Sequence, residues 1–94
     1  MFCVIGKVDI DASRVAEAEA VLHGQLLPAV KEMAGFVSGT WSRAMDDTNG
    51  MSMVLFEDEE SAQAAVAAAE GMAPPPGAPI TFGSFEVRKV IAQA

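Results

Sequence analysis

The sequence is poor in the residue types that build covalent cross-links, metal centres and proton-transfer chains. It contains no tyrosine, one cysteine (Cys3), one histidine (His23) and one tryptophan (Trp41). A single cysteine cannot form an internal disulfide, and no cluster of His, Cys and carboxylate residues has the spacing of a metal site. We therefore expect no metal. Cys3 lies in an apolar segment and is expected to be a small core residue in a reducing cytoplasm.

Positive charge and long apolar runs are also scarce. The chain has 6 Lys and Arg against 13 Asp and Glu, which gives a net charge of −7. Nucleic-acid binding requires a basic surface, and an anionic membrane would repel this chain, so neither is an expected partner. The apolar runs are too short to span a bilayer, and the N-terminus lacks the pattern of a secretion signal. A cytoplasmic protein is expected.

What the chain does contain is an ordered series of apolar segments. Their period of two predicts strands, and their period of three to four predicts helices. Strands are predicted at residues 2–10, 36–44, 51–57 and 80–91. Helices are predicted at residues 12–34 and from a cap at Asp58 to about residue 70. The order is therefore strand, helix, strand, strand, helix, strand.

Individual residues predict how these segments begin and end. Asp11 is expected to cap the first helix, and Gly35 to end it. Pro28 falls inside that helix, where it removes an amide and clashes with the carbonyl four residues earlier, so a kink or break is expected. The pair Asn49 and Gly50 suits a hairpin turn with positive φ, and Gly83 suggests a bend or bulge in the last strand.

The predicted architecture is an α+β, ferredoxin-like βαββαβ domain spanning residues 1–94. A four-stranded antiparallel sheet would carry both helices on one face. The strands have apolar residues at both parities, so the second face is also apolar and needs a cover. A second copy of the chain is the simplest cover, which predicts a sheet-to-sheet homodimer. The connector at residues 72–79 contains a run of prolines and is interpreted as a rigid loop, with a polyproline partner motif as the alternative.

Two stretches of sequence resemble a known family. GFVSGTW (residues 35–41) follows a helix with an internal proline, and LFEDEESAQAA (residues 55–65) joins a strand to an acidic-capped, Ala-rich helix. In order and spacing the chain resembles the antibiotic biosynthesis monooxygenase family of the dimeric α+β barrel superfamily. The resemblance implies a subunit whose sheet packs on its partner's sheet, and a cavity between the sheet and the helices. Some members oxidise aromatic polyketides without metal or flavin, and others degrade haem.

The family's functional residues are only partly matched. Haem-degrading members carry an Asn on the first strand, where this chain has Gly6 and Lys7, and a His in the second helix, whereas His23 lies in the first. Polyketide oxidisers place Asn, Trp and Tyr around the substrate. This chain has no Tyr, and Asn49 lies in the hairpin, so Trp41 alone is shared in kind. We expect no metal, flavin or haem cofactor.

Three residues are candidates for a site. His23 could act as a general base, although it has no visible partner in the sequence. Trp41 could stack on a flat ligand or simply fill the core. Arg43 could pair with an anionic ligand, or form a strand-end ion pair with Asp46 or Asp47.

Two functions follow from these candidates. The first is a cofactor-independent monooxygenase acting on a small hydrophobic or aromatic molecule. The second is a non-catalytic dimeric module that binds a small ligand or serves as an accessory. An enzyme predicts a pocket between the first helix and the sheet, lined by both His23 and Trp41. The Ala-faced second helix either lies very close to the sheet or leaves a space there.

Overall fold

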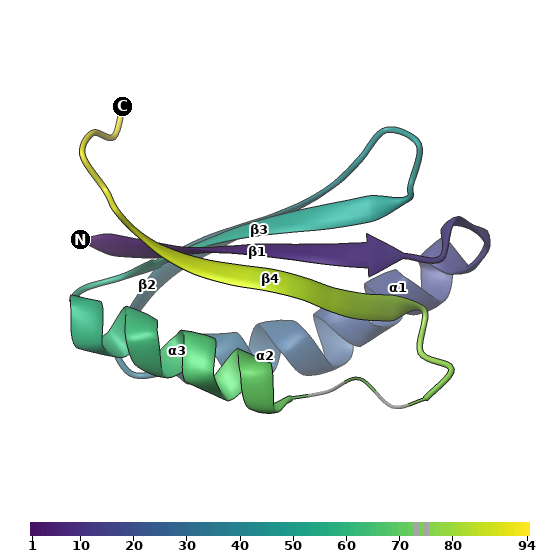
Figure 1. Ribbon diagram of the computed structural model, residues 1–94, viewed down its shortest axis with the longest axis horizontal. Coiled ribbons are helices and arrows are strands. Elements are labelled where there is room, and N and C mark those ends of the chain that lie inside the picture. Colours follow the sequence, from purple (N-terminus) through teal and green to yellow (C-terminus); the bar gives the residue numbers. More distant parts are fainter. Residues whose placement is uncertain (73, 75) are drawn as a thin grey trace.

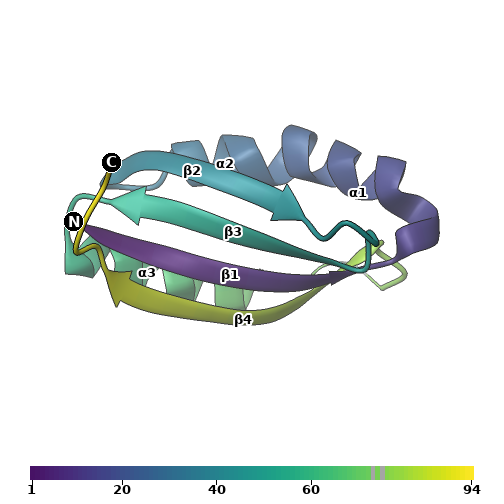
Figure 2. The same ribbon diagram turned by 90° about the horizontal axis from the view of Figure 1, so that it is seen from above.

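The strands form one antiparallel sheet with the helices on a single face. The computed structural model describes residues 1–72, 74 and 76–94. The sheet has the order β2-β3-β1-β4, and each neighbouring pair is antiparallel (Figure 2). The strands are β1 (Phe2–Ile10), β2 (Phe36–Arg43), β3 (Asn49–Phe56) and β4 (Ile80–Lys89). In Figure 1 the helices lie on one side of the sheet, and none of the described helices lies on the other. The predicted ferredoxin-like fold is confirmed.

The first helical segment is continuous but changes its winding. It consists of a 3-10 turn (η1, Ala12–Arg14), α1 (Val15–Val21), a π-helical turn (η2, Leu22–Leu26) and α2 (Leu27–Lys31). Asp11 caps it as predicted, accepting hydrogen bonds from the Ser13 amide at 3.0 Å and the Ser13 hydroxyl at 2.6 Å. These bonds, the hydroxyl first, lower the pKa of Asp11.

Pro28 does not break this helix, and the winding of the helix changes just before it. The turn just before it is π-helical, and the Leu27 amide donates to the carbonyl of Leu22, five residues earlier. In an α-helix the Pro28 ring would meet the carbonyl of Gly24. The wider π turn removes that clash and lets the helix run on. The helix ends at Lys31 with Glu32 as its C-cap, earlier than the end at Gly35 that the sequence predicted. Gly35 lies in the turn before β2 with φ +75°, and a Cβ there would lie 2.4 Å from the Ser61 hydroxyl oxygen.

The second helix, α3 (Glu59–Gly71), packs directly on the sheet. Asp58 caps it as predicted, accepting a hydrogen bond from the Ser61 amide at 2.7 Å. Its residues Ala62 and Ala65 are buried against strand residues of the core. Because these side chains are small, the backbone of α3 comes close to β1, β3 and β4. The first helical segment makes only scattered close approaches to the strands and so stands further off.

The hairpin between β2 and β3 differs from the expected turn. Asn49 and Gly50 are the first residues of β3, and the residue with positive φ is Asp47, at 65°. Asp tolerates this conformation better than most residues. The Asp46 carboxylate also supports the turn by accepting hydrogen bonds from the amide and hydroxyl of Thr48. Gly50 is instead required in the strand, where a Cβ would lie 3.2 Å from Ile10, Val8 and the Ser42 carbonyl.

The last strand has the bulge that Gly83 suggested. Lys7 pairs with Ser84 and Val8 pairs with Phe82, so Gly83 is the extra residue. A Cβ at Gly83 would lie 2.9 Å from the Lys7 carbonyl oxygen. The proline-rich connector contains Ala73 and Pro75, which lie outside the described residues. The choice between a rigid loop and a partner motif therefore stays a prediction.

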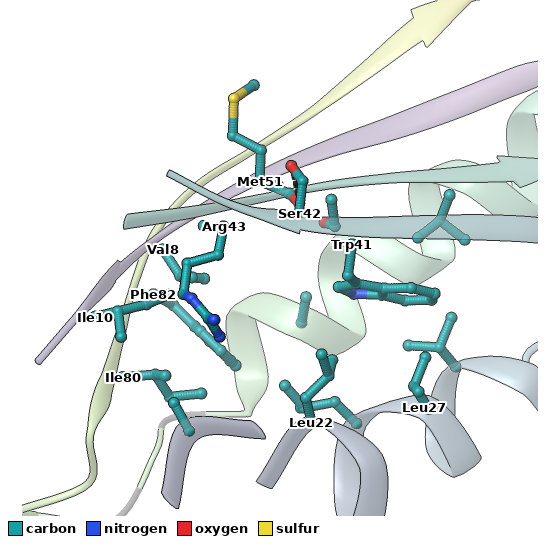
Figure 3. A pocket seen from close by; sticks show the side chains of 18 of the residues that line it. Val8, Ile10, Leu22, Leu27, Trp41, Ser42, Arg43, Met51, Ile80 and Phe82 are labelled. Carbon is teal, nitrogen blue, oxygen red and sulfur yellow. Dashed lines mark hydrogen bonds between the residues drawn. The ribbon is translucent and has the colours of Figure 1, made fainter. Parts of the chain in front are cut away.

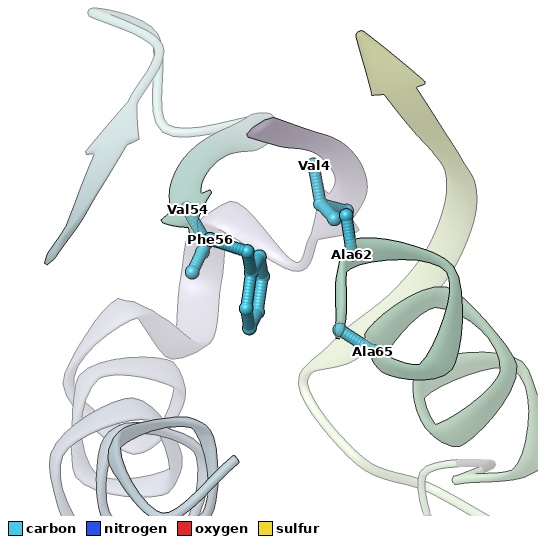
Figure 4. Close-up of a cluster of buried hydrophobic side chains, with 5 residues drawn as sticks. All are labelled: Val4, Val54, Phe56, Ala62 and Ala65. Carbon is cyan, nitrogen blue, oxygen red and sulfur yellow. The ribbon is translucent and has the colours of Figure 1, made fainter. Parts of the chain in front are cut away.

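The core is concentrated at one end of the sandwich. Phe56, which is 1% exposed, is surrounded by Val4, Val54, Ala62 and Ala65 (Figure 4). Phe36 meets Phe56 edge to face, with ring centroids 6.4 Å apart. At the other end of the sandwich the first helical segment stands off the sheet, which leaves room for a cavity.

The face of the sheet without helices is partly apolar. Ile5 pairs with Met53, and Cys3 pairs with Leu55, so these side chains share this face. Met51 is 46% exposed and Met53 is 51% exposed, whereas Cys3 is buried, as the sequence predicted. Among the described residues, no helix is both long and apolar enough to cross a membrane.

Candidate functional site

A cavity of about 770 Å³ lies between the sheet and the first helical segment (Figure 3). All four strands contribute to it, together with α1, η2, α2 and the inner edge of α3. The sequence predicted a pocket in this place. Its size falls within the range of small-molecule sites, and most of its lining residues are apolar, as is usual for such sites.

The floor of the cavity is made of unusually small residues. The strand register places Trp41, Ser52, Gly6 and Phe85 in one row across the sheet, all facing the helices. The two central members, Ser52 and Gly6, have almost no side-chain volume. A Cβ at Gly6 would lie 2.6 Å from the Ser52 hydroxyl oxygen and 3.0 Å from the Phe85 ring. The Ser52 hydroxyl and the Phe85 ring therefore lie over Gly6, and the cavity is a trough above this row with an aromatic wall at each end.

One wall of this trough is the indole of Trp41. In Figure 3 the ring lies flat beneath β2, with Leu22 and Leu27 facing it from the first helical segment. A Cβ at Gly39 would lie 2.6 Å from this ring, so the indole rests directly on the glycine. Trp41 is half-buried and also packs against the core. It therefore fills part of the core, one of the two roles considered from the sequence, and it also lines the cavity.

The opposite wall is formed by two phenylalanines of β4. The rings of Phe82 and Phe85 meet edge to face, with centroids 5.6 Å apart. They lie on either side of Gly83, and the bulge brings both onto the helix-facing side. In a regular strand, residues three apart would face opposite sides. The sequence analysis did not identify Phe82, Phe85 or the Gly6 floor; the bulge at Gly83 was the available signal.

The roof belongs to the first helical segment. Its lining residues are mostly aliphatic: Ala18, Leu22, Leu26, Leu27, Val30 and Met33. The alanine face of α3 has a mixed effect. It allows close packing at Ala62, but Ala65 and Ala69 also line the edge of the cavity. The space expected from small side chains is therefore present, although most of it lies under the first helical segment.

His23 and Trp41 line the same cavity. His23 lies in the π-helical turn and is exposed, so its place is at the mouth rather than in the interior. The four ionisable residues among the described lining are Glu19, His23, Arg43 and Asp47. All of them lie on the side of the cavity where α1 and η2 face the end of β2.

Arg43 forms the strand-end ion pair considered from the sequence, and a second one. Its Nε donates to the Asp47 carboxylate at 2.7 Å, and a terminal guanidinium nitrogen donates to Glu19 of α1 at 2.6 Å. The bond to Glu19 and then that to Asp47 raise the pKa of Arg43 above its usual value. Arg43 thus connects β2 to α1 at the mouth of the cavity.

Within the part of the chain that the structure describes, no group of three or more His, Cys, Asp or Glu residues could hold a metal ion. The cavity is suited to hold an apolar molecule, with polar side-chain groups at the mouth, at the Ser52 hydroxyl on the floor and at the Trp41 indole N–H in the wall. Its aromatic walls are suited to a flat molecule.

No model of a protein family matches the chain, and no curated protein matches it either. Solved structures do match. The haem degrader MhuD of Mycobacterium tuberculosis, with two haems bound in its active site, has a TM-score of 0.73 at 21% identity, covering 100% of this chain and 99% of that one. A dimeric ferredoxin-like protein from an uncultured marine organism has a TM-score of 0.65 at 13% identity, covering 99% and 97%.

A third structure is a monooxygenase from the gene ActVA-Orf6 of Streptomyces coelicolor, in complex with the ligand nanaomycin D. It has a TM-score of 0.55 at 17% identity, covering 99% of this chain and 92% of that one. At these identities the matches establish a common fold. The fold that the resemblance implied is thus confirmed: this chain has a ferredoxin-like fold in common with these solved structures.

Proposed function

We propose that this protein binds a small, flat, largely apolar molecule in the cavity between the sheet and the first helical segment. The observation that carries the proposal is the trough above the sheet. The indole of Trp41 walls it on one side and the rings of Phe82 and Phe85 wall it on the other. A planar ring system in this trough would contact aromatic walls on both sides and aliphatic side chains above.

The binding proposal can be tested with N-phenyl-1-naphthylamine, an uncharged, flat fluorescent probe. Trp41 is the only tryptophan, so quenching of its emission reports on a probe bound near this wall of the cavity. Wild-type protein is expected to bind the probe with saturable quenching. Gly6→Leu should abolish that quenching, because the added side chain would push the Phe85 ring into the cavity, and this loss assigns the bound probe to the cavity. Phe36→Leu is the matched control, because Phe36 packs against the core without lining the cavity. Wild-type protein that does not quench would refute the proposal.

The second candidate function is cofactor-free oxygenation of the bound molecule. It is favoured by the position of His23, which lines the same cavity as Trp41. The imidazole would accept a proton from an acidic CH₂ group of the substrate. The resulting carbanion would reduce dioxygen from solution and form a C–O bond. Loss of water then leaves a carbonyl. One atom of the dioxygen becomes the carbonyl oxygen, and the other leaves as water with the two hydrogens of the CH₂ group. A dry, apolar cavity would favour this chemistry.

Oxygen uptake with anthrone as the probe substrate tests this second function. Wild-type protein is expected to accelerate uptake over buffer, and His23→Ala should lose at least about a hundredfold of that acceleration if the imidazole is the base. Lys31→Ala, on the same helical segment but not lining the cavity, should leave it unchanged. If N-phenyl-1-naphthylamine binds and anthrone is not oxidised faster than in buffer, the non-catalytic binding module is the better description.

The residues of the cavity do not fit a haem held as the resemblance implies. The second helix brings Ala65 and Ala69 to the cavity, and neither can ligate iron. The first strand brings Gly6 where an amide side chain would be needed, and the sole histidine is on the opposite helical segment. Purified protein is accordingly expected to show no visible absorption band. A stoichiometric haem band in protein expressed in haem-replete cells would contradict this expectation.

We also propose that the sheet face without helices packs on the same face of a second copy. Its apolar residues include Ile5, Met51, Met53 and Leu55, and a similar solved structure is described as a dimeric ferredoxin-like protein. A chain of 94 residues buries a limited core of its own. A dimer of this kind would bury on the order of 2,000 Å² in total. The cytoplasmic location stays a prediction.

A further inference from the structure

The mouth of the cavity is spanned by a set of ion pairs that we call the clasp: Arg43 with Glu19 and Asp47. Glu19 belongs to α1, whereas Arg43 and Asp47 belong to the end of β2 and the hairpin after it. Arg43 and Glu19 are 24 residues apart in sequence, yet their side chains meet at 2.6 Å. All three residues line the cavity, and the Arg43 side chain is 33% exposed. Figure 3 shows the guanidinium extending from β2 toward the first helical segment.

The clasp carries more negative than positive charge. One guanidinium faces two carboxylates, so with His23 neutral the ionisable residues lining the cavity have a net charge of −1. Arg43 is the one permanent cation among those described lining residues. Both of its carboxylate partners are within hydrogen-bonding distance, so an incoming anion would compete with them for the guanidinium while being repelled by both. The whole chain adds to this repulsion, because its net charge is −7.

We propose that the clasp makes the cavity selective for uncharged ligands against anionic ones of the same shape. This inference rests on the proposed function and specifies its ligand class: a flat, apolar molecule without a carboxylate, sulfonate or phosphate group. Arg43 acts here as a specificity-determining residue and not as the receptor for a ligand anion that the sequence suggested. Its remaining N–H groups can still donate to a neutral acceptor, such as a carbonyl oxygen, on the bound molecule.

A matched pair of probes tests the proposal. N-phenyl-1-naphthylamine is uncharged, and 1-anilinonaphthalene-8-sulfonate is the same ring system with one sulfonate. The part of the Trp41 quenching that is lost in Gly6→Leu measures the binding of each probe at the cavity. Wild-type protein is expected to bind the uncharged probe at least about tenfold more tightly at low salt, and the ratio should shrink at high salt as the charges are screened. This comparison needs no variant of the clasp.

Variants then assign the effect to the clasp. The double substitution Glu19→Gln with Asp47→Asn changes the net charge of the mouth from −1 to +1. It should tighten binding of the sulfonate relative to binding of the uncharged probe by at least about tenfold. The control is Glu17→Gln with Glu60→Gln, which changes the charge of the whole chain equally but involves no cavity-lining residue. Both probes should bind the control as they bind wild type.

The possible outcomes separate the two ideas. If neither probe quenches Trp41 in the wild type, the proposed function is refuted and the clasp inference with it. If the uncharged probe binds and the sulfonate binds equally well, the binding site stands and the charge selectivity is refuted. If the control double variant tightens sulfonate binding as much as the clasp variant, selectivity comes from the overall charge, and the role of the clasp is refuted.

Discussion

At the scale of single residues, the shape of the site depends on glycines that lie beneath larger side chains. Gly39 is the clearest case. It lies two residues before Trp41 on the same face of β2, and the indole occupies the space that a Cβ would need. The planar wall of the cavity is therefore a property of a residue pair, since a tryptophan without the glycine beneath it could not lie flat against the strand.

Gly39→Ala is expected to push the indole off the sheet and into the cavity. The affinity for N-phenyl-1-naphthylamine should fall by about threefold to tenfold, as stacking on the indole is lost, and the Trp41 emission spectrum should shift. Gly71→Ala is the control. Nothing lies within 4 Å of the Cβ position at Gly71, so binding should not change and helix propensity should stabilise the fold by up to about 1 kcal/mol. Equal probe affinity in wild type and Gly39→Ala would contradict the stacking geometry.

The N-cap of α3 predicts a dependence of stability on pH. The hydrogen bond from the Ser61 amide, followed by that from its hydroxyl, lowers the pKa of Asp58 below the usual 3.8. A carboxylate with a depressed pKa stabilises the fold fully above the unfolded value, and that contribution is lost as the pH falls through the folded value. Asp58→Ala should lower the melting temperature by about 5 °C at pH 7.

Thermal unfolding of both proteins at equal concentration measures this effect. The difference between wild type and Asp58→Ala should shrink as the pH falls below 3.8 and the carboxylate takes up its proton. Asp58→Asn is the control, because Asn caps a helix without titrating, so its difference from Asp58→Ala should not follow this titration. A difference between wild type and Asp58→Ala that is independent of pH would contradict the linkage to Asp58.

At the scale of elements, the π-helical turn keeps one side of a long helical segment facing the cavity. The lining residues follow rows four apart: Ala18, Leu22, Leu26 and Val30 in one row, and Glu19, His23 and Leu27 in the next. In a straight α-helix such a row drifts by about 40° per step, because each residue turns by about 100°. A π turn rotates less per residue and so corrects the drift. Pro28 supports this winding, because it cannot donate to Gly24 in an α-helical turn.

Pro28→Ala is expected to allow an ordinary α-helical turn, with a new hydrogen bond from residue 28 to Gly24. Residues before the turn would then rotate by about 100° relative to those after it, which carries Glu19 and His23 away from the mouth. Probe affinity should fall about tenfold. Amide hydrogen exchange would detect protection at the new amide. Gln25→Ala, an exposed change within the π turn, is the control. Retention of the bond from Leu27 to Leu22 in Pro28→Ala would refute this role of Pro28.

At the scale of the whole molecule, the sheet has two faces with different roles. One face carries the helices and the cavity, and the other carries the exposed methionines Met51 and Met53 beside Ile5 and Leu55. Met51 shows the division directly, since its side chain points away from the cavity in Figure 3. The proposed dimer would use the second face and leave the mouth of the cavity accessible.

Met53→Glu is expected to convert the proposed dimer into a monomer, because a carboxylate would be buried without a partner in the interface. Sedimentation at micromolar concentration should show half the wild-type mass. Gln63→Glu adds the same charge on the exposed side of α3 and should leave the mass unchanged. Circular dichroism checks that Met53→Glu is folded. If it is not, the wild type still decides the question, since a wild-type monomer at this concentration would overturn the proposal.

Much of the fold could be predicted from the sequence. The order of the elements, the caps at Asp11 and Asp58 and the bulge at Gly83 all follow from local chemistry. Each depends on a residue and its near neighbours in the chain. Three local interpretations were wrong. The first helical segment ends at Lys31 and not at Gly35. The π turn accommodates Pro28 without a break, and Asp47 takes the positive φ expected at Asn49 and Gly50, which instead begin β3.

The sequence by itself determined the element order and the apolar character of both sheet faces, because hydrophobic period and capping are encoded within a few residues. Only the tertiary structure decided where the cavity lies and what surrounds it. The row that joins Trp41, Ser52, Gly6 and Phe85 exists through strand register, and the pair of Arg43 and Glu19 exists through the packing of a helix across a sheet. These contacts join residues far apart in the chain, and local periodicity does not specify them.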